Sequence, residues 1–223
     1  MKRFPNTMDK YLIDIIERML DTSDQIMEAG YNSLKTISWK ALREAEKVET
    51  VNFIPQLISF IDNEKDKKKR DKAYFLLGHI VKNTNKTTAL NYLIQRVEKE
   101  TDKYIVASLL DRIADIEKPI GTELQPLFDA IKSDKWLVRH SAIQSLNNSS
   151  DPLAETTLIE IIDSSDDPYN LIYSNATLNK IGTVRAIPYL EKHLKSRKRD
   201  VRESARFAIE EIMKRNKQES TNR

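Results

Sequence analysis

The chain has 223 residues and a mass of 25.9 kDa, which allows one large domain, two small ones or an array of repeats. Its 37 Lys and Arg against 34 Asp and Glu leave a net charge of +3, too small to indicate a nucleic-acid partner unless the excess is concentrated. The absence of cysteine excludes disulfides, thiolate metal ligands and a cysteine nucleophile. No apolar run of signal-peptide or membrane-span length occurs, so we expect a soluble, cytoplasmic protein.

The N-terminal region predicts two helices. The first starts near Met8, where Asn6 or Thr7 can cap it, and carries apolar residues at the helical spacing. A longer helical pattern follows over residues 27–48. We expect residues 1–50 to form a helical pair that caps the rest of the chain.

From residue 51 onward two apolar patterns recur roughly every 31–36 residues, a period typical of stacked helical repeats. The first pattern is an apolar pair four residues apart on a leading helix, at Leu57/Ile61, Leu93/Val97, Leu127/Ile131, Leu158/Ile162 and Leu190/Leu194. The second lies on a trailing helix and combines a reference position with apolar or small residues four and eight later, at Lys69/Ala73/Leu77, Ile105/Leu109/Ile113, Val138/Ala142/Leu146, Asn170/Ser174/Leu178 and Val201/Ala205/Ile209. The two registers agree, which predicts five helix pairs.

The residues between the apolar patterns are those that start and end helices. Asp151-Pro152 and Asp167-Pro168 place a capping side chain before a proline at the first helical position. Glycine followed by threonine, at Gly121-Thr122 and Gly182-Thr183, predicts the end of one helix and the cap of the next. No segment alternates with the period of two that strands require. We therefore predict an all-α fold, a right-handed α-solenoid (α-α superhelix) of about six helical hairpins.

The repeated units resemble HEAT repeats, particularly the short variety first described in phycobilisome-lyase subunits. The resemblance rests on Asp167-Pro168, Ile181-Gly182, Arg185-Ala186-Ile187-Pro188, Val138-Arg139-x-x-Ala142 and Val201-Arg202-x-x-Ala205. It covers residues 51–213 as five HEAT-like repeats and leaves 214–223 as a polar, disordered tail. The arginine that the family carries after the reference position is present at Arg70, Arg139 and Arg202, but Val106 and Leu171 replace it in the other two repeats, which interrupts any Asp/Arg ladder.

Catalytic and metal-binding patterns are weak. His79 and His140 lie on trailing helices two repeats apart, too far for a shared metal ion, and the His-Glu pairs of HEAT-type iron hydroxylases do not occur. Asp111 and Asp115 share a helical face as an acid/base pair does, but a solvated helix face has the same pattern. No nucleophile-elbow or phosphate-loop motif is present. We therefore expect no enzyme activity, no metal and no cofactor.

The C-terminal end is basic. Residues 191–223 hold 11 Lys and Arg against six acids, an excess of +5. This excess favours either a solubilising cap or phosphate contacts; the candidate contact residues are Arg197, Lys198, Arg199, Arg202 and Arg206. The segment 134–139 is similar to one in the HEAT-like alkylpurine DNA glycosylases, although their Trp-Trp-Asp element is missing. A nucleic-acid-binding protein related to those enzymes is the alternative function.

The resemblance implies that trailing helices line a concave face, and that positions two, three, six and ten after the reference position point outward from the core. The predicted strip includes Lys72, Phe75, His79, Asp111, Asp115, His140, Gln144, Tyr173, Lys180, Glu203 and Phe207. Aromatic residues among mixed charges suit a protein or peptide partner better than a DNA duplex. We therefore predict a non-enzymatic protein–protein interaction module; a chromophore-lyase subunit rests on fold analogy alone.

Overall fold

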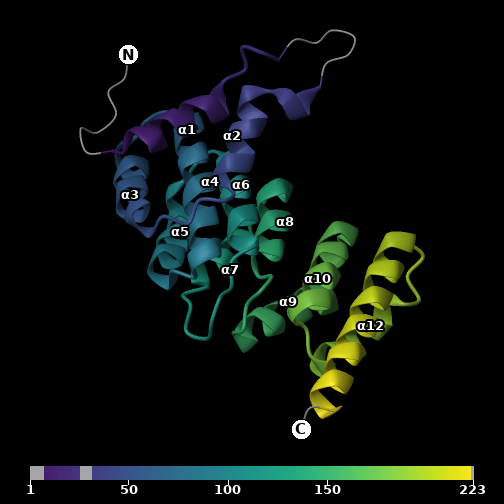
Figure 1. Cartoon of the computed structure of the whole chain (residues 1–223). Coiled ribbons are helices and arrows are strands. Elements are labelled where there is room, and N and C mark those ends of the chain that lie inside the picture. The colour runs from purple at the N-terminus through teal and green to yellow at the C-terminus, as the bar shows by residue number, and fades with distance from the viewer. Residues whose placement is uncertain (1–7, 26–31, 222–223) are drawn as a thin grey trace. The chain divides into compact units, whose positions relative to one another are not determined.

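The computed structural model describes residues 8–25 and 32–221 of the chain (Figure 1). Within these ranges the chain forms twelve α-helices and three short 3₁₀ helices, and no strand. The predicted all-α class is therefore confirmed. The helices belong to two compact units, residues 1–93 and 94–223. The boundary lies inside helix α5 (Thr87–Lys99).

Unit 1 contains four complete α-helices, and α1 packs against α2 and α4 while α3 packs against α4. They are α1 (Lys10–Leu20), α2 (Ile37–Ala45), α3 (Ile54–Asn63) and α4 (Lys67–Thr84), with the 3₁₀ helices η1 (Ser33–Lys35) and η2 (Val51–Phe53) between them. Its core is built from the apolar faces of these helices and includes Leu12, Ile15, Ile16, Leu57, Phe60, Leu76 and Leu77. Burial of these faces supplies most of the stabilisation, since short helices are marginal alone.

The N-terminal helices differ in their ends from the prediction. Asp9 caps α1 by accepting a hydrogen bond from the backbone N–H of Tyr11; the predicted caps Asn6 and Thr7 lie outside the described residues. The second helix starts only at Ile37, ten residues into the expected pattern. Thr36 fixes this start because its side-chain oxygen accepts from the N–H of Trp39. Residues 27–31 of the predicted helix also lie outside the described part.

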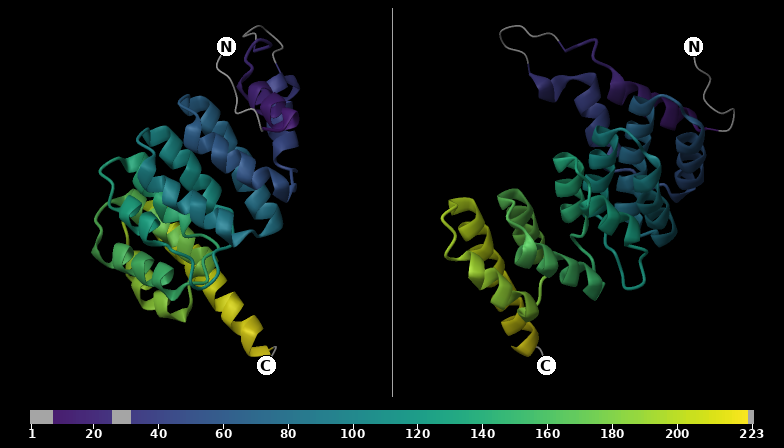
Figure 2. Two further views of the ribbon diagram at one scale, coloured as in Figure 1. Left: turned by 90° about the vertical axis from the view of Figure 1, so that its left-hand side faces the viewer. Right: turned by 180° about the vertical axis from the view of Figure 1, so that it is seen from behind.

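Unit 2 holds the end of α5 and seven further helices: α6 (Lys103–Ala114), α7 (Gln125–Ile131), α8 (Trp136–Ser145), α9 (Pro152–Ser164), α10 (Pro168–Ile181), α11 (Ile187–His193) and α12 (Arg199–Thr221). The trailing helices α6, α8, α10 and α12 pack side by side in chain order, and α7, α9 and α11 each pack on the helix that follows them. Figure 2 shows α10 and α12 next to each other in both views. Residues far apart in sequence are thus brought together mainly between successive repeats.

The two predicted apolar registers coincide with the buried positions of these helices. In the leading helices nine of the ten paired residues are buried, and only Leu194 is exposed, at 37%. In the trailing helices the residue four after each reference position is buried in all five repeats. Asp151 and Asp167 cap α9 and α10 in front of prolines, as expected.

The arginine after the reference position ties down the turn that precedes its helix. Arg70, Arg139 and Arg202 each donate through Nη1 to the backbone oxygen six residues earlier, at 3.0, 2.8 and 3.1 Å respectively. Arg139 also reaches the next repeat, where it bonds Asn170 Oδ1 at 3.0 Å and pairs with Asp167 at 3.3 Å. A repeated sequence feature therefore has one repeated structural role, and Arg139 adds a link between neighbours.

The loop after α6 is held by a buried lysine. Lys118 is 0% exposed, and its Nζ donates to the backbone oxygens of Ile113 at 2.7 Å and Ile116 at 2.6 Å. Its own backbone forms an isolated parallel bridge, with Lys118 N–H donating to Asn148 O and Ser150 N–H donating to Lys118 O, both at 2.8 Å. The α6–α7 loop is thereby fixed to the α8–α9 loop.

The glycine-threonine rule holds at one of its two sites. Gly182 ends α10 and Thr183 caps the 3₁₀ helix η3 (Val184–Ala186), as predicted. At Gly121-Thr122 the prediction was wrong, because α6 already ends at Ala114 and the Thr122 hydroxyl bonds Pro119 O within the loop. Gly121 instead adopts a φ of +87°, the left-handed backbone that favours glycine.

The last helix runs further than expected, through Thr221 rather than ending near residue 213. Arg215 explains the extension, because its guanidinium donates to Asn179 O and, at 2.7 Å, to Gly182 O at the end of α10. These contacts anchor a polar segment whose composition alone indicates a disordered tail.

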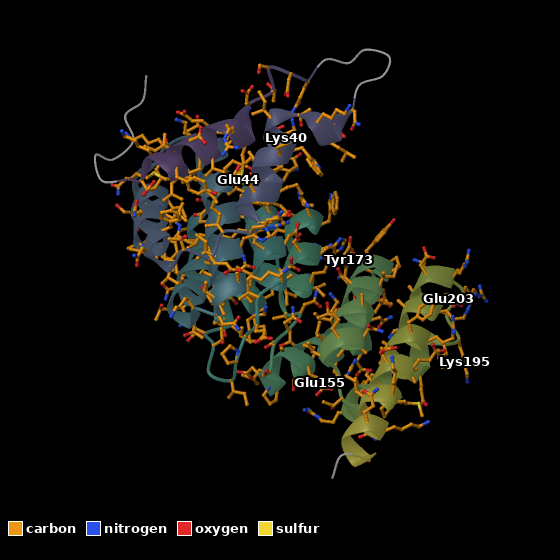
Figure 3. The ribbon with its side chains drawn as sticks, in the orientation of Figure 1. Lys40, Glu44, Glu155, Tyr173, Lys195 and Glu203 are labelled. Carbon is orange, nitrogen blue, oxygen red and sulfur yellow. The ribbon has the colours of Figure 1, made fainter. Side chains whose placement is uncertain are left out.

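A buried carboxylate connects α9 to the turn after α10 (Figure 3). Glu155 is 5% exposed; its Oε1 accepts from Thr183 N–H at 2.6 Å and from the Thr183 hydroxyl at 2.8 Å, and its Oε2 lies 3.5 Å from Arg185 Nη1. We expect Glu155→Ala to lower the free energy of unfolding by about 2–3 kcal/mol, because it removes a charge-assisted acceptor from two donors. Urea denaturation followed by circular dichroism measures this.

The matched control is Glu160→Ala, an exposed glutamate on the same helix α9. Its effect should stay within about 0.5 kcal/mol. Equal effects of the two substitutions would contradict the structural role of Glu155.

Candidate functional site

A hollow that combines aromatic and polar groups lies between α8 and α10 in unit 2. It has a volume of about 450 Å³ and is lined by Trp136, His140, Asp167, Tyr169 and Tyr173. We call it the aromatic pocket. Figure 3 marks Tyr173 on α10. The lining comes from two successive repeats, so the packing of α8 on α10 assembles it.

Helical spacing explains how each helix contributes two rings. Trp136 is the first residue of α8 and His140 follows four positions later. Tyr169 is the second residue of α10, and Tyr173 again follows four positions later. Side chains four residues apart lie on the same face of a helix, one turn from each other. Each helix therefore presents a ladder of two rings to the pocket.

His140 lies at the centre of the four rings. Its ring stacks on Tyr173 with centroids 4.6 Å apart and planes at 21°. Its centroid is 5.8 Å from that of Trp136 and 5.9 Å from that of Tyr169, in tilted arrangements. Trp136 and Tyr169 remain 62% and 61% exposed. The pocket thus has a fixed ring pair at its base and two accessible aromatic side chains around it.

The base of the pocket carries a polar atom with no partner. His140 is 6% exposed, and its Nε2 has no hydrogen-bond partner within the described structure. Burial lowers the pKa of His140, and the nearby positive charge of Arg139 lowers it further. The imidazole is therefore neutral at physiological pH. Buried polar atoms are normally satisfied, so an unsatisfied one at a pocket is a candidate contact for a ligand.

Asp167 supplies a negative charge at the pocket. Burial raises its pKa, but the backbone N–H groups of Tyr169 and Asn170 and the Arg139 guanidinium together hold that pKa below its usual value. The carboxylate accepts from Tyr169 N–H at 2.9 Å through one oxygen and pairs with Arg139 through the other. The pocket is thus aromatic, with one ionised carboxylate.

The structure distributes the predicted concave-face residues over both units. Lys72, Phe75 and His79 belong to α4 in unit 1; Asp111 and Asp115 lie on α6 and at its end, His140 and Gln144 on α8, Tyr173 and Lys180 on α10, and Glu203 and Phe207 on α12. His140 and Tyr173 line the aromatic pocket. His79 and His140 are buried rather than pointing into solvent, at 9% and 6% exposure. Burial also raises the pKa of Asp111, and the hydrogen bond with Ser141 opposes this rise only in part.

Sequence reasoning missed Trp136, Asp167 and Tyr169 as site residues. In the sequence, Trp136 belongs to the segment 134–139 that is similar to one in the glycosylases, and Asp167 is predicted as a helix cap. The signal that identifies Trp136 and Tyr169 is their position four residues before His140 and Tyr173, at the start of two consecutive trailing helices. The convergence of the two ring ladders depends on how α8 packs on α10.

The predicted basic end is partly neutralised by its own surroundings. Arg206 bonds Glu203 at 2.7 Å and Glu210 at 2.9 Å. Arg202 donates to Ser196 O and lies 3.7 Å from Glu203. Arg197, Lys198 and Arg199 are exposed at the turn before α12 and in its first residue. Three of the five predicted cations thus remain accessible side by side.

In residues 8–25 and 32–221 no group of three His, Asp or Glu has the geometry of a metal site. None of the helices in these ranges combines the length and apolar composition needed to cross a bilayer.

Known proteins with similar sequence or structure indicate which kind of repeat the chain contains. Residues 124–210 match the family model of HEAT repeats. A designed armadillo repeat protein is similar over 90% of this chain and 99% of its own, with a TM-score of 0.50 and 14% identity. A second, described as in complex with peptide (KR)4, gives the same values. No curated protein sequence matches the chain. The predicted HEAT repeats are confirmed for residues 124–210, and the α-solenoid class is confirmed by the structural likeness.

Proposed function

We propose that the HEAT repeats of residues 124–210 act as a non-enzymatic interaction module that binds an extended segment of a partner protein across α8 and α10. The observation that carries this proposal is the aromatic pocket. Three accessible or half-buried aromatic side chains, Trp136, Tyr169 and Tyr173, converge there from two repeats around the unsatisfied Nε2 of His140.

The chemistry of the pocket suits an anchor for a protein partner. Binding energy at protein interfaces concentrates on a few aromatic and arginine side chains in pockets that exclude water. Trp136 and Tyr169 offer large contact areas that are exposed in the free chain. The stack of His140 on Tyr173 is already formed, so a partner need not order it.

The fold supports the same proposal. Stacked helical repeats form extended surfaces on which a peptide can lie across several units. The second similar designed armadillo repeat protein is in complex with a peptide. A solenoid of this kind can therefore present its trailing helices to an extended chain.

The test is selection of displayed random peptides on the full-length protein. We expect enriched sequences whose synthetic peptides bind with micromolar Kd and lose affinity at least ten-fold when Tyr169 and Trp136 are both changed to Ala. Tyr104→Ala is the matched control, because Tyr104 is 64% exposed on α6 and does not line the pocket. Its binding should equal that of the wild type.

The outcome that contradicts the proposal is specific. If no peptide is enriched, and fluorescence anisotropy shows tight, salt-dependent binding of duplex DNA that is lost on changing Arg197, Lys198 and Arg199 to Ala, the protein is a nucleic-acid binder that uses its basic end. Peptide binding that survives the double pocket substitution would place the interaction elsewhere on the repeats.

A further inference from the structure

We propose that the aromatic pocket recognises an arginine side chain of the partner, whose guanidinium lies among the rings and donates hydrogen bonds to His140 and Asp167. This inference rests on the proposed function and specifies the chemistry of its anchor.

The rings favour a cation. The face of an aromatic ring carries negative potential, and a cation within about 6 Å of a centroid is attracted to it. Trp136, Tyr169 and Tyr173 surround one hollow, so a single charged group can contact several rings. The chain already uses this interaction elsewhere, since Arg206 lies 4.6 Å above the Phe207 ring and Arg43 lies 5.6 Å above Trp39.

The unsatisfied nitrogen is an acceptor. Burial lowers the pKa of His140, so its imidazole is neutral and one of its two nitrogens is an acceptor. Nε2 is the nitrogen that has no hydrogen-bond partner in the described structure, so we assign the acceptor role to it and the proton to Nδ1. A neutral imidazole that donates through Nδ1 has a lone pair on Nε2. A ligand that donates an N–H at the base of the pocket satisfies it.

The charges at the pocket also favour a positive ligand. The cation Arg139 acts on His140, but its guanidinium is directed to Ser133 O, Asn170 Oδ1 and Asp167 Oδ2. The carboxylate of Asp167 accepts from Arg139 and from the backbone N–H groups of Tyr169 and Asn170, whereas an ionised carboxylate offers about four lone-pair sites. Its side chain is 36% exposed, which leaves capacity for a ligand donor.

Arginine fits this combination better than lysine. Its guanidinium is planar, weakly hydrated and able to stack on an aromatic face while its edge donates in several directions. The hollow of about 450 Å³ is large enough for such a group. A trimethylated lysine is also attracted by rings but has no N–H for His140 Nε2.

The direct test uses blocked amino acids and the fluorescence of Trp136. The chain has two tryptophans, so full-length Trp39→Phe protein isolates the reporter. N-acetyl-arginine amide should change the Trp136 emission with a Kd on the order of 1 mM. The neutral isostere N-acetyl-citrulline amide should bind about ten-fold more weakly. The trimethyl-lysine and leucine amides should also bind more weakly than arginine.

A second variant tests the acceptor. His140→Phe preserves the aromatic packing on Tyr173 and removes Nε2, and should weaken the arginine probe about ten-fold. Tyr104→Ala should leave the Kd unchanged. The arginine assignment is overturned if the citrulline or leucine amide binds as tightly as the arginine amide, or if no probe changes the Trp136 emission below 50 mM. In that case the proposed function still holds if peptides selected without arginine lose binding when the pocket residues are substituted.

Discussion

The free energy of unfolding is expected to rise from pH 7.5 to 9.5 because Lys118 is neutral in the folded protein. Burial lowers the pKa of Lys118 from its ordinary value of 10.5 to about 7, and the charge of Asp115 opposes this shift only in part. A neutral amine still has two N–H donors, one for each of its two backbone acceptors, Ile113 O and Ile116 O.

The sign follows from proton binding. Between pH 7 and 10.5 the unfolded chain holds a proton on Lys118 that the folded chain lacks, so folding releases a proton and stability increases with pH. The contribution is about 1.4 kcal/mol per pH unit inside this window, and the cost of burying the lysine is fully present below pH 7.

Urea denaturation at pH 7.5, 8.5 and 9.5 measures this slope in the wild type and in Lys118→Met. Lys118→Met should lose the slope, because it has no titrating group at this position. Its absolute stability is a separate matter, since the substitution leaves two carbonyl groups without their donor. Lys132→Met removes an exposed lysine whose side chain is 74% accessible, and should keep the wild-type slope. Parallel pH profiles for wild type and Lys118→Met would mean that Lys118 is charged in the fold.

Gly182→Ala is expected to lower the free energy of unfolding by about 2–4 kcal/mol through overpacking and a lost hydrogen bond. A Cβ at this position would lie 2.6 Å from Leu178 O and 3.0 Å from Ile212 Cδ1. The backbone is ordinary there, with φ −66° and ψ 148°, so the obstacle is the close approach rather than strain. The N–H of Gly182 itself donates to Leu178 O at 2.7 Å, and this is the hydrogen bond that the substitution disturbs.

A double variant separates the two clashes. Ile212→Val removes Cδ1 and should restore only a minor part of the stability of Gly182→Ala, since the contact with the rigid helix backbone remains. Thermal and urea unfolding of the two single variants and the double variant provide the comparison. An effect of Gly182→Ala below about 0.5 kcal/mol, the range of ordinary surface changes, would contradict the packing seen at the end of α10.

The repeat architecture was predictable because it depends on local periodicity. Apolar residues at helical spacing and Asp-Pro caps act within one helix or one turn, and Leu158, Ile162 and Asp167 could be assigned from such patterns alone. The residues of the aromatic pocket were predicted only in part, since His140 and Tyr173 each follow from the register within their own repeat. Their meeting with Trp136 and Tyr169 depends on packing between repeats.

Lys118 shows a second limit of sequence reasoning. Lysine is almost never fully buried, so composition and periodicity assign it to the surface. Its position is set by a loop-to-loop bridge with residues near Asn148, which are distant in sequence. The same applies to α12, where Arg215 extends the helix by contacts with the end of α10.

Arg139 gives the pocket a mechanical property. Its side chain bonds the turn before α8 and also pairs with Asp167 at the start of α10. Arg139 therefore connects the two helices whose rings line the aromatic pocket. Separation of these two helices would divide the pocket into halves that each retain two rings. A ligand that contacts the rings of both helices therefore bridges α8 and α10. Its binding free energy adds to the free energy needed to separate these two helices.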